Sequence, residues 1–488
     1  MNLAAQTTEP YDVLIMGAGM SGLCMAIALK RAGRHHFVVL EKSPELGGTW
    51  WDNRYPGPHV DVPAPLYSFS FAPNRQWSRR FAAAPEIHRY MQAVARQHGV
   101  LPHLRLGMQV ATARFDEASG LWQVHTHCGE QMRARYFVCS TGPLSQPRWP
   151  DIAGLQSFQG RLVHTSRWDP HEGPRGQRVG VIGTGSTAAQ IVAPLADQAA
   201  QLVVFQRTAN WVLPRLDRRY NALDRALMHV PGYSAAVRRF WFHVLELGRR
   251  GFDEGTAARR TMQHAAAAHL KRQVPDAVLR AKLNPPYPLG CKRIIYANDY
   301  FPALTKPHVH LETDAVDHIS PHGVVMNDGR KHALDVLVCA TGFDVQHSLA
   351  AVPITGRAGQ RLQDLWAAGP QAYLGLTAAG FPNLFLMLGP NTATGHTSTL
   401  LYIEPGVRWA VRAMQEVQRR GRRWLDIKPE VMQQFNAELQ ARLGPSVWSA
   451  CRSWYRAESG RHIAIWPGFT REYVTAVDQQ SFDHFEFG

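Results

Sequence analysis

Two glycine-rich motifs with the spacing of dinucleotide-binding turns carry the clearest chemistry in this chain. Their glycines, and the alanine that replaces the last one, are Gly17, Gly19, Gly22, Gly183, Gly185 and Ala188. Such glycines let the backbone approach a pyrophosphate, and the N-terminus of the following helix stabilises its charge. Two sites of this kind in one polypeptide predict that electrons pass from one bound dinucleotide to the other.

The side chains after each motif indicate which dinucleotide it binds. Glu41 ends the strand after the first motif and can accept hydrogen bonds from ribose hydroxyls. The matching strand after the second motif ends in Gln206 and Arg207, without an acid. Arginine binds a 2′-phosphate bidentately whereas a carboxylate would repel it, so this site is predicted to take NADPH rather than NADH. Lys292 is a second candidate phosphate contact, and a solvated surface charge is the alternative role for Arg207.

Both motifs lie where an apolar strand turns into a helix. The first unit is expected to contain a strand over 11–16, a helix over about 21–32 and a strand over 37–41. The second is expected to contain a strand over 178–183, a helix over about 186–198 and a strand over 202–207. Two copies of this βαβ unit predict an α/β fold with two Rossmann-like domains.

The loop over 47–61 combines turn-forming residues with several aromatic ones, among them Trp50, Trp51 and Tyr55. Flat side chains suit a planar ring system and the entrance to its site. A well-packed structural loop is the alternative interpretation.

Composition is that of a globular protein with an uneven basic excess. The chain has 488 residues, 45% hydrophobic and 19% charged, and a formal net charge of +15. Residues 211–291 carry 14 Lys and Arg against 6 Asp and Glu. No nucleic-acid recognition motif accompanies them, so attraction of an anionic dinucleotide or simple solubility is the favoured explanation, and no nucleic-acid partner is expected.

Cysteine and histidine spacing excludes several other chemistries. The six cysteines form no CxxC pair, which predicts a reduced, intracellular protein without structural disulfides. The histidines lack metal-ligand spacing, so no metal site is expected. The apolar stretch over 13–29 contains the first glycine motif and is predicted to be a strand and a helix rather than a membrane span. We therefore expect a cytoplasmic protein without a transmembrane segment.

A short signature between the two glycine motifs indicates a family. It reads Phe158-x-Gly160-x-x-x-His164-x-x-x-Trp168-Asp169. It resembles the fingerprint of the flavin-dependent (class B, FAD and NADPH) Baeyer–Villiger monooxygenases, within the flavin-containing monooxygenase superfamily. The loop over 47–61 matches a second pattern of that family, Gly-Gly-x-Trp, four residues, Tyr-Pro-Gly, three residues, Asp. The similarity runs from Tyr11 to about Tyr473.

The resemblance implies roles for individual residues. Arg293, which follows Lys292, would lie beside the flavin and hold negative charge during the reaction, and Asp61 would pair with Arg293 and orient it. A purely structural ion pair is the alternative for Arg293, and His164 is given a hinge or domain-orientation role. The cofactor-binding residues that the motifs and the resemblance imply are Gly17, Gly19, Ser21, Gly22, Glu41, Thr49, Trp50, Asp61, Tyr67, Val110, Gly183, Thr184, Gly185, Ser186, Thr187, Gln190, Arg207, Thr208 and Lys292.

The resemblance also implies a reaction and a domain order. NADPH would reduce FAD, O2 would add to give a C4a-peroxyflavin, and the peroxide would attack a small-molecule ketone to give an ester or lactone. The stretch over 389–398 departs from the best-known cyclic-ketone enzymes, so no particular ketone is predicted. The FAD domain would comprise 1–147 and 341–488, with the NADPH domain over 148–340. Residues 211–291 would form a helical insertion covering the cleft, a membrane-surface or partner-binding helix being the alternative.

Three other classes of protein share parts of this sequence pattern. A flavin monooxygenase that oxygenates sulfur or nitrogen would use the same cofactors, but related enzymes usually lack the closing Trp-Asp of the signature. A disulfide reductase also pairs FAD with NADPH, but it needs a redox cysteine pair that this sequence does not show. A basic, non-enzymatic nucleotide-sensing or nucleic-acid-binding protein would be colourless and would bind DNA with a steep salt dependence.

Overall fold

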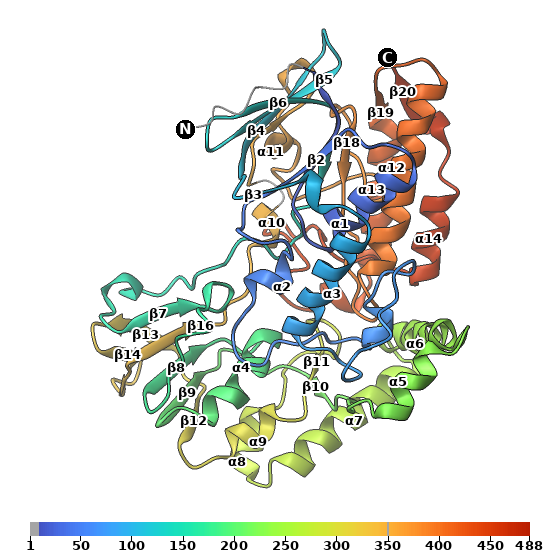
Figure 1. Ribbon diagram of the computed structural model, residues 1–488. Helices are drawn as coiled ribbons and strands as arrows, with labels where there is room; N and C mark the ends of the chain where they lie inside the picture. Colours follow the sequence, from blue (N-terminus) through green and yellow to red (C-terminus); the bar gives the residue numbers. More distant parts are fainter. Residues whose placement is uncertain (1–8, 349–350) are drawn as a thin grey trace.

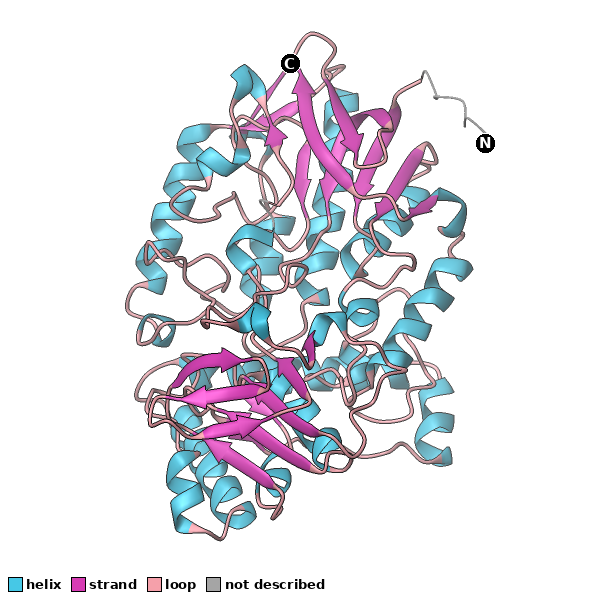
Figure 2. Cartoon of the chain, turned by 90° about the vertical axis from the view of Figure 1, so that its left-hand side faces the viewer, coloured by secondary structure: helices cyan, strands magenta, loops and turns pink. Residues whose placement is uncertain are grey.

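Two main sheets, well separated in space, organise the chain (Figures 1 and 2). The computed structural model describes residues 9–348 and 351–488. The first sheet has the strand order β17-β4-β5-β6-β1-β2-β3, with β18 paired to β6, and the second has the order β12-β9-β8-β16-β7. Both have a parallel core with helices between the strands, so the predicted α/β fold with two Rossmann-like units is confirmed.

The first glycine motif joins β1 to α1 in the first sheet. Its strands are β1 (Tyr11–Met16), β2 (Phe37–Glu41), β3 (Leu104–Leu106), β4 (Val110–Asp116), β5 (Leu121–Thr126), β6 (Gln131–Cys139), β17 (Ile354–Thr355) and β18 (Leu384–Leu386). β1 pairs in parallel with β2 and β6. Its apolar residues are buried because α1 (Met20–Arg31) and the neighbouring helices cover the sheet, which explains the continuous hydrophobic run. The predicted strands over 11–16 and 37–41 are confirmed.

The second glycine motif joins β8 to α4 (Ser186–Ala196) in the other sheet. The strands of this sheet are β7 (Arg161–His164), β8 (Arg178–Ile182), β9 (Gln201–Phe205), β12 (Val309–Glu312) and β16 (Val336–Cys339). All of its neighbouring strands are parallel, and apolar clusters fill both of its faces. The second βαβ unit is therefore present as predicted, with element ends shifted by one or two residues.

The chain passes between the sheets twice, and the two passages lie side by side. After β6 and after β16 the backbone enters similar Thr-Gly turns. Pro147 and Phe343 form an isolated antiparallel bridge, and the Arg148 backbone N–H donates to the Gly342 carbonyl over 3.0 Å. These contacts hold the two connections together at the point where the sheets meet.

A group of helices, coloured green to yellow, lies in the lower part of Figure 1. It contains α5 (Ala222–His229), α6 (Tyr233–Gly248), α7 (Ala257–Gln273) and α8 (Ala277–Lys282). The predicted helical character of 211–291 is therefore confirmed. Arg238 on α6 donates to the Ser68 carbonyl over 2.7 Å, and buried Glu246 accepts the backbone N–H groups of Thr470 and Arg471 over 3.2 and 3.1 Å. These bonds tie α6 to segments of the first sheet's half of the molecule.

The remaining elements complete the two halves. The helices are α2 (Thr49–Asp52), α3 (Ala84–Gln97), α9 (Tyr300–Leu304), α10 (Val345–Ser348), α11 (Leu362–Leu365), α12 (Leu400–Arg419), α13 (Pro429–Leu443) and α14 (Thr470–Asp478). The small sheets are β10 (Val212–Leu213) with β11 (Ile295–Tyr296), β13 (Val316–Ser320) with β14 (Gly323–Met326) and β15 (Lys331–Ala333), and β19 (Leu425–Ile427) with β20 (Phe485–Phe487). β18 (Leu384–Leu386) is only three residues long, because Leu388 and Asn391 after it adopt positive φ angles.

One expectation about cysteines is wrong. Cys291 and Cys451 form a disulfide although they are 160 residues apart, with their Cα atoms 6.1 Å from each other. Neither belongs to a short CxxC pattern, since only the tertiary fold brings the two residues together. The other four cysteines are free. The argument from cysteine spacing for a reduced compartment therefore fails.

Within the described part of the chain, no helix combines the length and the apolar character that a membrane crossing requires. The apolar stretch over 13–29 forms β1 and α1, as predicted. The cytoplasmic location and the lack of a nucleic-acid partner stay predictions from the sequence.

Candidate active site

Both glycine motifs line one large cleft. Its volume is about 1750 Å³, and residues of both sheets line it. The predicted site residues that line it are Gly17, Gly19, Ser21, Glu41, Thr49, Trp50, Asp61, Tyr67, Val110, Gly183, Thr184, Gly185, Ser186, Thr187, Gln190, Arg207, Thr208, Lys292 and Arg293. Gly22 is the exception, because an added Cβ there would meet the Gly17 carbonyl oxygen. Gly22 therefore serves close packing of α1 on β1 rather than forming the cleft wall.

The middle glycine of each motif leaves open space in the cleft. An added Cβ at Gly19 would have Gly48 Cα as its nearest neighbour, 3.8 Å away, and at Gly185 it would meet nothing within 4 Å. At Gly17, by contrast, it would lie 2.6 Å from the Ser140 carbonyl oxygen. The chain is thus packed tightly around each turn but keeps a hollow that a side chain would fill, which fits a pyrophosphate.

The helices that start at these turns lack side-chain caps. No side chain bonds the first turn of α1 or of α4, and neither first turn contains an acid. Their leading N–H groups and positive dipole ends are available to an anion in the cleft. The donor sets therefore fit the phosphates of FAD at the first turn and of NADPH at the second.

Glu41 is engaged by the backbone of the first motif. Its two carboxylate oxygens accept the N–H groups of Ala18 and Ser43 over 2.8 and 2.9 Å, and the residue is buried. Each carboxylate oxygen has further acceptor capacity toward the cleft. Glu41 therefore shapes the glycine turn in addition to the ribose contact that the sequence suggests.

The aromatic loop bridges the two halves of the cleft. Trp50 donates from its indole N–H to the Tyr67 hydroxyl over 3.1 Å, and the two rings meet edge to face. The Tyr55 hydroxyl donates to Gln190 Oε1 over 2.7 Å, and the Gln190 amide donates to the His59 carbonyl over 3.0 Å. Gln190 belongs to α4, so the loop after the first glycine motif is bonded to the helix of the second.

Arg293 and Asp61 meet in this cleft, as the resemblance implied. Arg293 Nε donates to Asp61 Oδ2 over 2.9 Å, and its NH2 group bonds the same oxygen. Their side chains are 33% and 27% exposed, so both can face a bound molecule. The negative charge of Asp61 raises the pKa of Arg293 above its ordinary value. Arg293 therefore stays cationic at every working pH.

Two further residues contact the Arg293 guanidinium. Its NH1 group donates to the Thr394 carbonyl over 3.5 Å, and the guanidinium lies near the Tyr455 hydroxyl. Burial raises the pKa of Tyr455 to about 12 although the charge of Arg293 opposes this, so the phenol is neutral. Sequence reasoning missed both residues as partners of Arg293. No spacing pattern in the chain places Tyr455 or Thr394 next to Arg293.

Lys292 and Arg207 form a cationic pair beside the second motif. Burial, followed by the charge of Arg207, lowers the pKa of Lys292. Lys292 Nζ lies 4.6 Å from the centroid of the Tyr287 ring. Among the described residues, neither cation forms an ion pair, which is unusual for two positive charges held near each other and fits a site for a phosphate.

A series of hydrogen bonds supports the second glycine turn. Thr184 Oγ1 donates to the Thr208 carbonyl over 2.8 Å, and the Asn210 amide donates to the Thr184 carbonyl over 2.7 Å. The Tyr287 hydroxyl in turn donates to Asn210 Oδ1 over 2.7 Å. Asn210 and Tyr287 were not predicted, because single polar residues in loops carry no distinctive pattern.

His164 lies at the meeting point of the two halves and not among the reacting groups. It ends β7, is fully buried, and its ring nitrogens bond Ser166 Oγ at 2.9 Å and the Gly342 carbonyl at 3.1 Å. Burial lowers the pKa of His164 to about 4, so the ring is neutral. The segment from His164 to Trp168 is a strand end and a 3-10 turn rather than an α-helix.

Comparisons with known proteins agree with this geometry. Residues 14–222 match the pyridine nucleotide-disulphide oxidoreductase family. Among curated proteins, a Baeyer–Villiger monooxygenase of Streptomyces coelicolor is 38% identical over 96% of this chain and 91% of its own length. A Baeyer–Villiger monooxygenase of Pseudomonas aeruginosa is 37% identical over 97% and 92%.

Solved structures agree as well. An oxidized steroid monooxygenase bound to NADP is 30% identical, with a TM-score of 0.88 over 98% of this chain and 99% of that one. The closed form of cyclohexanone monooxygenase is 28% identical, with a TM-score of 0.89 over 99% and 100%. Both glycine turns, the linking signature and the Arg293–Asp61 pair thus stand in a chain that belongs to the Baeyer–Villiger monooxygenase family and is an FAD- and NADPH-dependent flavoprotein monooxygenase.

Proposed function

We propose that this enzyme oxygenates a small-molecule ketone to an ester or lactone at Arg293, with O2 as the oxygen source. The observation that carries the proposal is the Arg293–Asp61 pair on the wall of the cleft that also contains both glycine turns. A ketone is oxidised through attack on its carbonyl carbon, which needs a nucleophilic, anionic oxygen. A permanent cation at the reacting atoms favours that charge state.

Each part of the cleft is assigned one task. When bound, FAD supplies the oxygen-activating chemistry and NADPH supplies its two electrons. The first glycine turn, Glu41, the loop with Thr49, Trp50 and Tyr67, and Val110 would hold FAD, and the turn over 183–187 with Gln190, Arg207, Thr208 and Lys292 would hold NADPH. Arg293 holds negative charge that develops on the reacting oxygen atoms, and Asp61 orients Arg293. The neutral Tyr455 hydroxyl adds a dipole without adding charge.

We also propose the domain division drawn from the sequence, with the FAD domain over 1–147 and 341–488 and the NADPH domain over 148–340. Sheet membership supports it, since β1–β6, β17 and β18 belong to one sheet and β7–β9, β12 and β16 to the other. The bridge between Pro147 and Phe343 supports the placement of both boundaries. His164 bonds the second passage through Gly342, which supports its role in setting the domain orientation.

Replacement of Arg293 tests the central assignment. We expect Arg293→Ala to remain yellow and to oxidise NADPH, while ester formation from linear, cyclic and aryl ketones falls by about 10²–10³-fold, because the charge at the reacting atoms is lost. Product mass analysis with a ketone and a thioether measures this. Full ester yield from the variant would remove Arg293 from the reaction, and oxidation of only the thioether by the wild type would instead support a heteroatom oxygenase.

The assignment of the 2′-phosphate is tested with Arg207. Arg207→Ala should raise the KM for NADPH by about 10- to 100-fold, since a charged hydrogen bond is lost, and leave the KM for NADH nearly unchanged. Steady-state kinetics with both nucleotides give the ratio, and FAD content serves as the control for folding. An unchanged preference would show that another residue recognises the phosphate.

Lys292 predicts a pH dependence of cofactor binding. Because burial and Arg207 lower its pKa, Lys292 loses its proton at a lower pH than an ordinary lysine, and its attraction for the phosphate disappears as pH rises through that value. The Kd of NADPH should therefore increase between neutral and alkaline pH, while the Kd of NADH should not. Lys292→Arg should flatten the profile. Parallel profiles for the two nucleotides in the wild type would contradict the assignment.

A further inference from the structure

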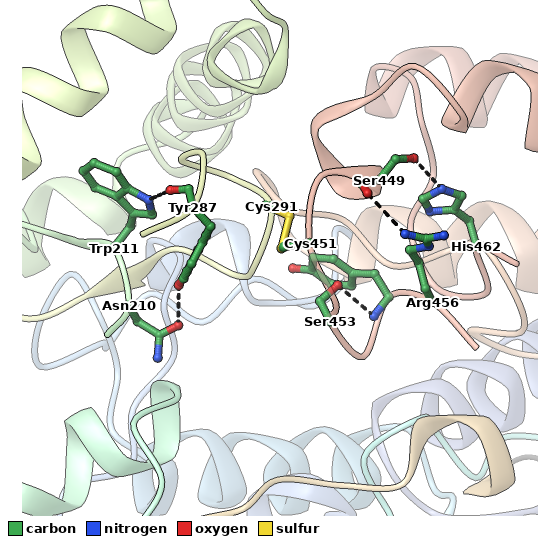
Figure 3. The surroundings of a disulfide bond; sticks show 10 residues. Asn210, Trp211, Tyr287, Cys291, Ser449, Cys451, Ser453, Arg456 and His462 are labelled. Carbon is green, nitrogen blue, oxygen red and sulfur yellow. Dashed lines mark hydrogen bonds between the residues drawn. A yellow bond between two sulfur atoms is a disulfide. The ribbon is translucent and has the colours of Figure 1, made fainter. Parts of the chain in front are cut away.

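The Cys291–Cys451 disulfide joins two segments that are far apart in the sequence and lie side by side at the cleft (Figure 3). Cys291 directly precedes Lys292 and Arg293, and Cys451 directly precedes a segment, 452–454, that lines the cleft. We infer that this disulfide is a positioning device: it holds Arg293 against the C-terminal wall of the cleft, and its reduction loosens both. The inference rests on the role proposed for Arg293.

The segment before Cys291 is anchored to the NADPH side. The Trp211 indole N–H donates to the Tyr287 carbonyl over 2.8 Å, and the Tyr287 hydroxyl bonds Asn210, as the left part of Figure 3 shows. Asn210 bonds the Thr184 carbonyl in the second glycine turn. Movement at Cys291 is therefore limited on this side by bonds that reach the second glycine motif.

The segment around Cys451 is anchored to the other side. Arg456 donates to the Ser449 carbonyl over 3.2 Å, and Ser449 Oγ bonds His462 Nε2 at 2.9 Å, as the right part of Figure 3 shows. Burial lowers the pKa of His462 to about 4, so this bond involves a neutral ring. The loop that carries Cys451 is thus a compact unit of the C-terminal part of the chain.

The two segments meet a second time at Arg293. Arg293 lies two residues after Cys291, and Tyr455, which lies near its guanidinium, is four residues after Cys451. The disulfide and the Arg293–Tyr455 contact therefore connect the same two segments at two nearby points. A covalent bond so near the contact keeps its partners at high effective concentration, because few chain conformations separate them. Cys291 is fully buried and Cys451 only partly, so a reagent reaches the bond from the Cys451 side.

The bond opens by thiol–disulfide exchange with a small-molecule dithiol. One thiolate of the reagent attacks a sulfur of the bridge, and its second thiol then resolves the mixed disulfide. The protein gains two electrons and two protons as Cys291 and Cys451 become thiols, and the reagent leaves as its own disulfide. After this step no covalent bond joins the loop that carries Cys451 to the segment that carries Arg293.

The test compares the oxidised holoenzyme with the dithiol-treated one. Alkylation of the unfolded protein followed by mass analysis should show four labelled cysteines before treatment and six after it. Hydrogen–deuterium exchange should rise in 287–293 and in 449–456. Ester formed per NADPH oxidised should fall by about 10- to 100-fold, as misplacement of a catalytic group predicts, while the FAD content stays unchanged.

Two variants sharpen the result. The double variant Cys291→Ala/Cys451→Ala should behave like the reduced wild type and no longer respond to dithiol, whereas Cys128→Ser, which removes an exposed free thiol, should respond like the wild type. If the double variant fails to fold, the comparison of the wild type before and after dithiol treatment still tests the inference. Six labelled cysteines before treatment, or a full change in labelling with unaltered exchange and ester yield, would overturn the inference. Exchange reports on the bridge even if Arg293→Ala shows that Arg293 is dispensable.

Discussion

The ion pair between Arg293 and Asp61 is the interaction around which the cleft is organised. Asp61 comes from the loop after the first glycine motif, whereas Arg293 comes from the segment that follows the helical insertion. Their pairing requires both halves of the molecule to be in place. Because the two side chains remain partly exposed, the pair can face a molecule bound in the cleft. The pair lines the same cleft as both glycine turns.

Several positive groups that line the cleft have no acidic partner among the described residues. The first turns of α1 and α4 carry neither caps nor acids, and Arg207 and Lys292 form no ion pair among the described residues. Folding leaves these groups unsatisfied, which costs stability, and phosphates of bound dinucleotides offset that cost. The bonds from Tyr55 to Gln190 and from Gln190 to His59 connect the two halves directly. These bonds join the loop that carries Asp61 to the helix of the second glycine motif.

Secondary structure and turns were predictable from local sequence patterns. The strands over 11–16 and 37–41, both glycine turns and the helical character of 211–291 follow from periodicity and turn chemistry, and the structure contains them. Asp61 was paired with Arg293 only through family resemblance, since 232 residues separate them. Tyr455, Thr394 and the Cys291–Cys451 bond were missed because their proximity is created by the tertiary fold, and no spacing in the chain records it.

The proposed function depends on Asp61 holding the Arg293 guanidinium in its orientation. The Asp61→Asn variant tests this most directly. The variant keeps the size of the side chain and the guanidinium but removes the ion pair. We expect it to retain FAD and NADPH oxidation, while ester formed per NADPH oxidised falls by about 10- to 100-fold because Arg293 loses its orientation. Ester formed per NADPH equal to that of the wild type would contradict the account.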